Sequence, residues 1–338
     1  MEKGKILFLN EKEIKELISA EQVLNLVEEV LKAYARGETI NPVKLSLPLH
    51  PYHAGRINSM PSYIKPGDLS GVKVVSVHGE NPGKYHLPTT LGTIILHDPD
   101  NGLPYAILGG THITAMRTGA AAAVQAKHLA RRNSRTLSIV GAGAQGFTSM
   151  QMTVLAVPGI KQVRIRDIAA GNSESFIARG RALFPHLEFL SCQSNGEALT
   201  GTDIAVYATS SETPILEGSR LDEGVTVICV SEMLTPKTLS MFDSWYVDFT
   251  ACSIERFNAE GHIIAKKTGS VYADLAGDMV TGEIGDVMIG RTPGRTGENQ
   301  RILATSVGMS IEDVVVARAA YDAAVEGKKG LILDFQNG

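Results

Sequence analysis

The stretch Thr136-Leu-Ser-Ile-Val140-Gly141-Ala-Gly143-Ala-Gln-Gly146 decides the fold of this chain. Five residues typical of a β-strand lead into the spacing Gly-x-Gly-x-x-Gly, and the run from Phe147 to Val157 is predicted to be a helix. Gly141 would allow a tight turn, Gly143 would let the backbone approach a pyrophosphate, and Gly146 would let the helix pack against the strand. The first N–H groups of that helix would face the phosphates. This order of elements predicts a dinucleotide-binding fold.

An acidic residue supports this interpretation and indicates which dinucleotide is bound. Asp167 follows Gly146 at the end of a second predicted strand, Gln162–Arg166, where a carboxylate can accept hydrogen bonds from ribose hydroxyls and repel a 2′-phosphate. No arginine directly follows the acid to receive such a phosphate. The sequence therefore favours NAD as the cofactor. NADP stays open as an alternative, because Arg164 or Arg166 could turn toward the ribose.

The composition is that of a soluble globular protein. The 338 residues are 43% hydrophobic and 20% charged, and this length predicts two domains. A net charge of -4 gives no reason to expect a nucleic-acid partner. The 3 cysteines and 9 histidines lack disulfide or metal-binding spacings, so no metal site is expected. With no apolar run near the ~20 residues of a membrane helix, and with a charged start, the chain is predicted to be cytoplasmic, without a membrane partner.

The predicted elements place a mixed α/β region before and after the dinucleotide-binding fold. Capping boxes at Asn10–Glu13 and Ser19–Gln22 start two helices. Short apolar runs separated by Pro and Gly then predict antiparallel strands at Lys44–Leu49, Arg56–Met60, Gly71–Val77, Leu91–Leu96 and Tyr105–Leu108. An Ala-rich helix at Thr111–Ala130 precedes the dinucleotide-binding fold. Later elements are buried strands at Asp203–Ala208, Val225–Val230 and Tyr246–Phe249, and a last helix at Met309–Val325.

The expected fold class is α/β, with a Rossmann-type NAD(P)-binding domain beside a discontinuous α+β domain. The α+β domain would be formed by residues 1–115 and by a C-terminal helix within residues 309–338 that returns to it, and residues 116–308 would form the Rossmann-type domain. A cleft between the two would hold substrate beside the nicotinamide, at the carboxyl ends of the parallel strands.

Two cations outside the glycine-rich turn are candidates for substrate chemistry. Arg117 lies near the start of a predicted helix, just before an uncharged segment of small residues, where the helix dipole disfavours a cation, so we expect an anion beside it. Lys73 is a single cation on the apolar strand Gly71–Val77. Such a lysine often faces solvent, but one buried in a cleft has a lowered pKa and can act as an acid or a base.

The motifs together resemble the ornithine cyclodeaminase/μ-crystallin family. The similar segments are Arg56-Ile-Asn-Ser-Met60-Pro61, Lys73, Arg117-Thr-Gly-Ala-Ala, Gly141–Gly146, Gly282–Arg295 and Thr305–Asp313. The resemblance spans about residues 10 to 325 and implies a homodimer formed through the N-terminal sheets, which makes the α+β domain one for substrate binding and dimerisation. Family members pass a hydride between the nicotinamide and a carbon that bears nitrogen next to a carboxylate. The implied substrate is therefore a small amino or imino acid.

The resemblance also assigns roles by position. Lys73 and Arg117 match residues that hold the substrate carboxylate and take part in catalysis, and Arg117 also matches a contact to the cofactor. On the substrate side the further matches are Lys44, Arg56, Met60, Val307 and Gly308. On the cofactor side they are Thr89, Thr118, Gly141, Gly143, Ala144, Gln145, Gly146, Asp167, Thr209, Val230, Ser231, Met233 and Lys237.

Two departures from the family pattern bear on the reaction. Cyclodeaminases carry a catalytic Asp where this chain has Met233, and the adjacent Glu232 is the acid that would take over its role. A carboxylate-binding arginine is replaced by Lys44, which cannot form the same two-pronged contact. These departures weaken ornithine cyclisation but leave redox chemistry at a C–N bond intact.

Three functions therefore stay open. The first is an NAD(P)-dependent amino-acid dehydrogenase or imine reductase, with alanine dehydrogenase and ketimine or pyrroline-2-carboxylate reductase as the family models. The second is a redox-neutral ornithine or lysine cyclodeaminase, which would give a cyclic imino acid and ammonia. The third is a non-catalytic NAD(P)H-binding or ligand-binding protein of the μ-crystallin kind. The sequence favours the first of these, since fold alone does not fix chemistry.

Overall fold

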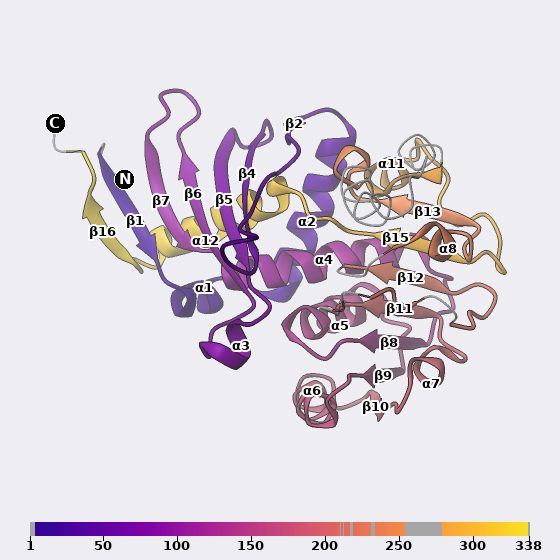
Figure 1. Cartoon of the computed structure of the whole chain (residues 1–338). Helices are drawn as coiled ribbons and strands as arrows, with labels where there is room; N and C mark the ends of the chain where they lie inside the picture. The colour runs from indigo at the N-terminus through magenta and orange to yellow at the C-terminus, as the bar shows by residue number, and fades with distance from the viewer. Residues whose placement is uncertain are drawn as a thin grey trace. The chain divides into compact units, whose positions relative to one another are not determined.

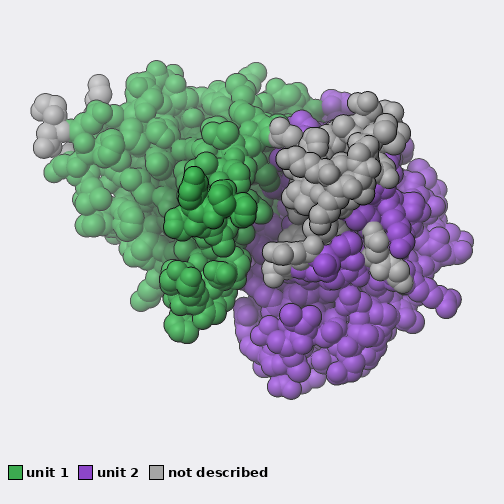
Figure 2. Space-filling model, viewed as in Figure 1, with its two compact units in different colours: residues 1–117, 309–338 green, residues 118–308 purple. Residues whose placement is uncertain are grey.

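The chain divides into two compact units in the computed structural model (Figures 1 and 2). Unit 1 contains residues 1–117 and 309–338, and unit 2 contains residues 118–308. The structure describes residues 4–336 apart from 210, 212, 217–218, 231–233 and 254–278. Ser231, Glu232 and Met233 of the predicted site therefore lie outside the described residues.

Unit 1 is built on an eight-stranded sheet in the order β16-β1-β7-β6-β5-β4-β2, with β3 paired to β4 (Figure 1). The strands are β1 (Lys5–Leu9), β2 (Thr39–Ile40), β3 (Leu45–Pro48), β4 (Arg56–Ile64), β5 (Leu69–Val77), β6 (Thr90–His97), β7 (Pro104–Gly109) and β16 (Leu331–Asp334). The antiparallel neighbours β3 to β7 confirm the five predicted strands. The sequence missed β1, parallel to β7, and β16, antiparallel to β1, because each is too short for a clear periodic pattern.

The helices of unit 1 other than α4 are α1 (Glu11–Leu17), α2 (Ala20–Ala35), α3 (Asn81–Lys84) and α12 (Ser310–Glu326). Helices α1, α2 and α12 pack together over one face of the sheet, and α3 lies in the connection between β5 and β6. The Asn10 side chain accepts the Glu13 N–H, and the Glu13 carboxylate accepts the Asn10 N–H, which confirms the first capping box. Helix α12 packs across β4, β5 and β6 and against α2. We call the face of the sheet under α12 the inner face and the opposite face the outer face.

Helix α4 (Thr111–Leu129) confirms the predicted Ala-rich helix; it begins in unit 1 and continues into unit 2. Its residues Ala120 to Val124 are all buried. A Cβ atom on Gly119 would lie 2.6 Å from the backbone carbonyl of Thr148. Only glycine therefore allows this close approach of α4 to α5.

Unit 2 is built on a parallel sheet in the order β10-β9-β8-β11-β12-β15-β13-β14. The strands are β8 (Thr136–Val140), β9 (Gln162–Arg166), β10 (Glu188–Ser191), β11 (Ile204–Tyr207), β12 (Thr226–Cys229), β13 (Ser244–Val247), β14 (Gly282–Glu283) and β15 (Ile302–Thr305). The described helices that follow α4 here are α5 (Ala144–Ala156), α6 (Ala170–Leu183), α7 (Asn195–Leu199), α8 (Pro236–Leu239) and α11 (Ile284–Met288). The chain leaves β8 toward β9 and returns on the other side at β11, the doubly wound topology of a Rossmann-type fold.

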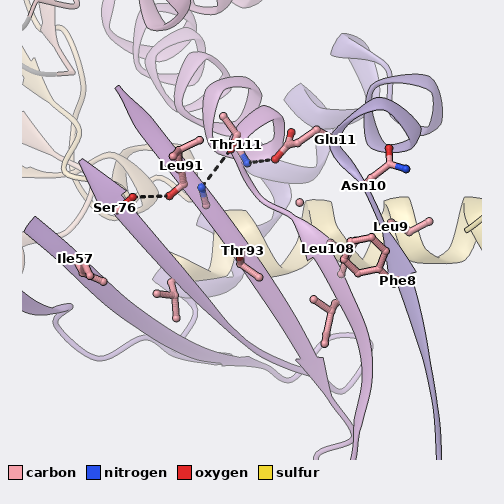
Figure 3. A pocket seen from close by; sticks show the side chains of 14 residues that line it. Phe8, Leu9, Asn10, Glu11, Ile57, Ser76, Leu91, Thr93, Leu108 and Thr111 are labelled. Carbon is pink, nitrogen blue, oxygen red and sulfur yellow. Dashed lines mark hydrogen bonds between the residues drawn. The ribbon is translucent and has the colours of Figure 1, made fainter. Parts of the chain in front are cut away.

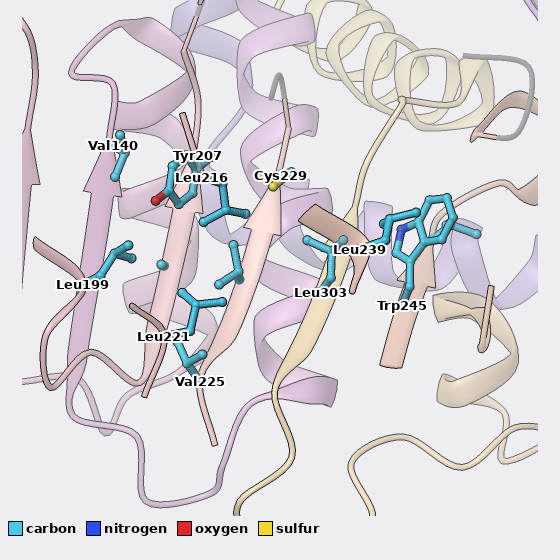
Figure 4. Close-up of a cluster of buried hydrophobic side chains, with 13 residues drawn as sticks. Val140, Leu199, Tyr207, Leu216, Leu221, Val225, Cys229, Leu239, Trp245 and Leu303 are labelled. Atoms are coloured by element: carbon cyan, nitrogen blue, oxygen red, sulfur yellow. The ribbon is translucent and has the colours of Figure 1, made fainter. Parts of the chain in front are cut away.

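The structure confirms the predicted strands β8, β9, β11, β12 and β13 of this sheet and adds β10, β14 and β15. The central strands are buried on both faces, as parallel sheets require, and Tyr207, Cys229, Trp245 and Leu303 contribute to one apolar cluster (Figure 4). Helix α5 begins at Ala144 rather than at the predicted Phe147, because the residues after Gly143 already form its first turn. Gly143 is thus the N-cap of α5.

Candidate active site

Lys73 lies on the inner face of the unit 1 sheet, under α12. Neighbouring strands place Met60 and Ile94 on either side of it, and its side chain has 0% exposure. A Cβ atom on Gly71, two residues earlier on the same face, would lie 3.0 Å from a methyl group of Val314. Helix α12 therefore approaches β5 closely at this point, and residues of its first turns reach Lys73.

Two carboxylates of α12 meet two cations at this place. Nε of Arg117 donates to Oδ1 of Asp313 at 2.9 Å, and Nη1 of Arg117 donates to Oε2 of Glu312 at 2.9 Å. Nζ of Lys73 lies 2.5 Å from Oδ2 of Asp313. We call these four residues the ion cluster. Lys73, Glu312 and Asp313 are fully buried and Arg117 is nearly so, and the formal charges of the four sum to zero.

The Lys73–Asp313 contact has ion-pair distance but not hydrogen-bond angles. Among the described residues, neither Nζ of Lys73 nor Oδ2 of Asp313 has a hydrogen-bond partner. A lysine ammonium carries three N–H donors. Leaving them unsatisfied in a buried site costs free energy, so donors in this position are suited to a polar ligand.

The surroundings of Lys73 tune its protonation. Burial lowers the pKa of Lys73, the positive charge of Arg117 lowers it further, and Asp313 and Glu312 raise it, with the result at about 8. Burial also acts to lower the pKa of Arg117, but Asp313 and Glu312 raise it above its usual value. Arg117 is thus a permanent cation, whereas Lys73 can gain or lose a proton near neutral pH.

The anion expected beside Arg117 is present, and the chain itself supplies it. Arg117 lies in the second turn of α4, buried, and its partners are Glu312 and Asp313. Sequence reasoning missed both acids as site residues. An acidic pair in the first turn of a helix is an ordinary stabiliser of the helix dipole, so its sequence carries no sign of a second role.

The other predicted residues of unit 1 fall into two groups. Met60 is buried beside Lys73. Leu45 is the strand partner of Ser59, and the two strands are antiparallel. Lys44, which precedes Leu45, therefore lies at the level of Met60. Arg56 and Thr89 lie at one end of the sheet instead. Arg56 pairs with Val77, roughly 13 Å along the strands from the Met60–Lys73 pair at 3.3 Å per residue, so it is not part of the ion cluster.

Two of the three glycines after β8, Gly141 and Gly146, have the structural roles predicted for them. Gly141 has a φ of 102°, and a Cβ atom there would overlap the carbonyl oxygen of Ala208. A Cβ atom on Gly146 would overlap the carbonyl oxygen of Gly141, whereas one on Gly143 would meet nothing within 4 Å. The exposed Gly143 therefore leaves open space where a pyrophosphate could approach the backbone.

The neighbouring groups also fit a dinucleotide. Gly143 gives α5 no side-chain cap, so the N–H groups at Ala144 and Gln145 are suited to bind phosphate oxygens. Asp167 follows β9, and its Oδ2 accepts the Ala142 N–H at 2.8 Å. The carboxylate at the predicted ribose position is thus fixed against the glycine turn.

The two arginines that left NADP open are engaged with backbone carbonyls in this structure. Nη1 of Arg164 donates to the carbonyl oxygen of Thr200, and Nη1 of Arg166 donates to that of Asp167. Both guanidinium groups are thus held by carbonyl oxygens, and the carboxylate at the predicted ribose position is that of Asp167. This arrangement favours a dinucleotide without a 2′-phosphate.

Other predicted cofactor and substrate residues of unit 2 lie at the carboxyl edge of its sheet. Thr209 follows β11, Val230 follows β12, and Val307 and Gly308 follow β15. The Gly308 N–H donates to Oδ2 of Asp248 at 2.8 Å, which fixes that last turn. Thr118 is half-buried on α4, and Lys237 is exposed on α8.

Unit 1 also contains a cavity of about 520 Å³ (Figure 3). Its apolar lining includes Phe8, Ile57, Val74 and Ile107. Glu11 lines it too, and its carboxylate accepts the N–H groups of Thr111 at 2.7 Å and of His112 at 2.9 Å, which caps α4. Val74 and Lys73 are consecutive strand residues and face opposite sides, so this cavity is separate from the ion cluster.

The described residues hold no group of three or more His, Cys, Asp or Glu side chains placed to bind a metal ion. Within the same part of the chain, no helix has the length and apolar character that a membrane span requires. The three cysteines are free and buried.

The doubly wound sheet, the glycine turn after β8 and the acid after β9 define a nucleotide-binding protein of the Rossmann type. The chain belongs to the Ornithine cyclodeaminase/mu-crystallin family, whose model matches residues 5–328. The resemblance inferred from the motifs is thereby confirmed.

Three similar proteins cover nearly the whole chain. Thermococcus litoralis Delta(1)-pyrroline-2-carboxylate reductase, solved with NADH and L-proline, is 31% identical with a TM-score of 0.87, and the match covers 96% of this chain and 99% of that one. An archaeal alanine dehydrogenase dimer with bound NAD is 26% identical with a TM-score of 0.85, and the match covers 98% of this chain and 100% of that one. The N-((2S)-2-amino-2-carboxyethyl)-L-glutamate dehydrogenase of Staphylococcus aureus is 28% identical, and the match covers 97% of this chain and 98% of that protein.

Proposed function

We propose that this protein is an NAD-dependent oxidoreductase that acts on the C–N bond of a small α-amino or α-imino acid. The observation that carries the proposal is Lys73, a fully buried lysine whose N–H donors have no hydrogen-bond partner among the described residues and whose pKa is lowered to about 8. Three relatives named as dehydrogenases or as a reductase of such compounds support it.

Lys73 is the proposed acid and base. As an ammonium it would donate a proton to the substrate nitrogen during reduction, and as an amine it would accept that proton during oxidation. A pKa near the working pH keeps both forms available. When NAD is bound, its nicotinamide ring supplies or accepts the hydride at the carbon of the C–N bond.

The substrate carboxylate is proposed to bind to hydrogen-bond donors of Lys73 and Arg117, with Lys44 as a further cation. The ion cluster is neutral as a whole, so its attraction for an anion rests on directed donors rather than on net positive charge. Lys44, at the level of Met60 beside Lys73, adds the positive charge that the cluster lacks. Binding at the charged end would orient the reacting carbon.

Unit 2 is proposed as the NAD-binding domain, with the pyrophosphate at the turn from Gly141 to Gly146 and the ribose at Asp167. The open space at Gly143 and the uncapped start of α5 support this assignment. Unit 1 is proposed as the domain for substrate binding and dimerisation. A cytoplasmic location stays a prediction.

A homodimer is proposed from the outer face of the unit 1 sheet. Leu45 and Leu47 on β3, Val74 on β5 and Phe8 on β1 are 74%, 57%, 41% and 38% exposed, and this much exposure of large apolar side chains on one face is typical of an interaction surface. The archaeal alanine dehydrogenase relative is described as a dimer. A second copy of this chain is therefore the proposed cover of that face.

The experiment that tests the function is a panel of amino acids with NAD and of 2-oxo acids, amines and cyclic imines with NADH, followed by absorbance of the reduced nicotinamide. The reductase relative was solved with L-proline, so proline and its cyclic imine belong in the panel. Turnover with net change in NADH supports the proposal. Tight NADH binding without turnover on the whole panel would contradict it and favour a binding protein.

The family name keeps ornithine cyclodeaminase as the second candidate. Its sign would be a cyclic imino acid and ammonia formed from ornithine or lysine without net NADH. In that case Glu232 would have to supply the missing acid, and an inactive Glu232→Gln variant would support this alternative.

A further inference from the structure

The carboxylate of Asp313 contacts both cations of the ion cluster, one with each oxygen. Oδ1 accepts from Nε of Arg117 on α4 at 2.9 Å, and Oδ2 lies 2.5 Å from Nζ of Lys73 on β5. Oε2 of Glu312, its neighbour, accepts from Nη1 of Arg117 at 2.9 Å and from the Met309 N–H at 3.4 Å. The consecutive acids therefore share Arg117, whereas Asp313 also forms the ion pair with Lys73.

The start of α12 is tied to the strands that carry and flank Lys73. Oγ of Ser310 donates to the carbonyl oxygen of Met60 at 2.5 Å and accepts from Oγ of Ser62 at 3.2 Å. The Ile311 N–H donates to Oδ1 of Asn41 at 3.3 Å. These bonds fix the register of α12 on the inner face, so Asp313 reaches Lys73 in a defined position.

We propose that Asp313 is a positioning residue of the active site, which orients the Lys73 ammonium, keeps it protonated, and locks Arg117 in place. The catalytic consequence rests on the proposed function, but the effect on the Lys73 proton does not. Asp313 itself is fully buried and contacts both cations.

The charges around Lys73 give the sign of the effect. From α4 it is faced by Arg117, from α12 by Asp313 and Glu312, and from β4 and β6 by the apolar Met60 and Ile94. Without the Asp313 charge, Lys73 and Arg117 would share the single carboxylate of Glu312. Lys73 would then lose its proton at a lower pH, because burial and Arg117 would act with less opposition.

The test compares two isosteric variants of adjacent residues, Asp313→Asn and Glu312→Gln. The pH profile of kcat/KM is measured for each, with NADH binding followed by fluorescence. For Asp313→Asn we expect the inflection assigned to Lys73 to move to lower pH by about one to three pH units, the effect of an adjacent opposite charge. For Glu312→Gln we expect a smaller shift, and NADH binding serves to check that each variant is folded. Profiles that coincide with the wild type would overturn the proposal.

A second measurement does not depend on activity. The pKa of Lys73 is about 8 in the folded protein, below the ordinary value of 10.5, so the unfolded chain binds more protons between these pH values. The free energy of unfolding therefore rises with pH in that window. In Asp313→Asn the rise should begin at a lower pH, and in Lys73→Met it should be absent. If the enzyme turns over but the pH dependence of unfolding does not shift in these variants, the role of Asp313 is wrong and the proposed function stands. If the pH dependence shifts but no C–N substrate is turned over, the proposed function is wrong and the role of Asp313 stands.

The Asp313→Asn variant could fail to fold because it buries an uncompensated charge. In that case the double variant Lys73→Met/Asp313→Asn is expected to fold, since it leaves only the pair of Arg117 and Glu312. Failure of the double variant to restore folding would overturn the assignment of Asp313 as the counterion of Lys73.

Discussion

Lys73 on β5 and Asp313 on α12 form a fully buried ion pair, with 2.5 Å between Nζ and Oδ2. Burying two charges costs several kcal/mol per ion before their attraction is counted, and replacing such a pair by apolar residues is often neutral or stabilising. The pair is therefore poorly explained by stability. Its position beside Arg117 and its unsatisfied N–H donors are better explained by chemistry at Lys73.

Replacing Lys73 by Met should remove turnover and leave nucleotide binding intact. Loss of a general acid or base lowers the rate about 10²- to 10⁴-fold, and Lys73 lies in unit 1 whereas the glycine turn lies in unit 2. Steady-state kinetics and NADH fluorescence measure the two effects. The matched control is Lys65→Met, because Lys65 is exposed in the turn between β4 and β5. A Lys73→Met enzyme with wild-type kcat/KM would exclude the assigned role.

The pH dependence of stability should report Lys73 directly. Its pKa is lowered from 10.5 to about 8, so its folded form is protonated less readily than its unfolded form. The stability that Lys73 contributes is present above the unfolded pKa and is lost as the pH falls toward 8. The stability of the wild type relative to Lys73→Met should thus rise by about 3 kcal/mol across this window, at 1.36 kcal/mol per pKa unit. Denaturant unfolding at several pH values measures it, and parallel curves for the two proteins would contradict the assignment.

The sequence predicted the nucleotide fold well because its signals are local. The glycine spacing, the strand before it and Asp167 lie within one βαβ unit, and the structure confirms the tight turn at Gly141 and the close packing at Gly146. Lys73 and Arg117 were identified because each is a cation in a segment whose other residues are uncharged. Such local conflicts are expected at functional sites.

The rest of the ion cluster depends on tertiary structure. Glu312 and Asp313 meet Arg117 because α12 crosses the sheet in one particular register. The sequence predicted that the last helix returns to the first domain, but not which of its side chains would meet Arg117. Strands β1, β10, β15 and β16 were missed for a related reason. Each has four or five residues and forms only through pairing with a neighbour.

Replacing Asp167 by Ala should weaken NADH binding and reduce the preference for NADH over NADPH. A hydrogen bond to a charged group contributes about 1.5–3 kcal/mol, so NADH affinity should fall by about tenfold or more. The control is Asn172→Ala, which removes a 3.0 Å hydrogen bond to Oδ1 of Asp167 but keeps its charge. Fluorescence titrations with both cofactors measure the ratio. A preference that Asp167→Ala leaves unchanged would mean that another group selects the cofactor.

Charging the outer face of the unit 1 sheet should dissociate the proposed homodimer. Leu47 is 57% exposed on β3, and a Leu47→Glu change would place a carboxylate on the apolar face without disturbing the buried core. Sedimentation analysis should find a lower mass for this variant than for the wild type. Leu183→Glu is the control, since Leu183 is 49% exposed on α6 of unit 2 and should not affect the mass. A wild-type chain that is already monomeric would contradict the proposed dimer.

Two glycine substitutions in the turn after β8 should separate folding from cofactor binding. A methyl group on Gly146 would overlap the carbonyl oxygen of Gly141 and lie 3.1 Å from Ile139, so Gly146→Ala should destabilise the protein by about 1–3 kcal/mol. A methyl group on Gly143 would meet no protein atom within 4 Å, and Gly143 has an ordinary φ of -79°. Gly143→Ala should therefore keep its melting temperature nearly unchanged.

The same Gly143→Ala variant should nevertheless lose NADH affinity by about tenfold or more, because the methyl group would occupy the space through which a pyrophosphate approaches the backbone. Thermal unfolding and NADH titration on the two variants measure the separation. If Gly143→Ala bound NADH as the wild type does, the pyrophosphate would have to lie elsewhere than at the start of α5. The fold of unit 2 would then be of the nucleotide-binding type without using its glycine turn for that purpose.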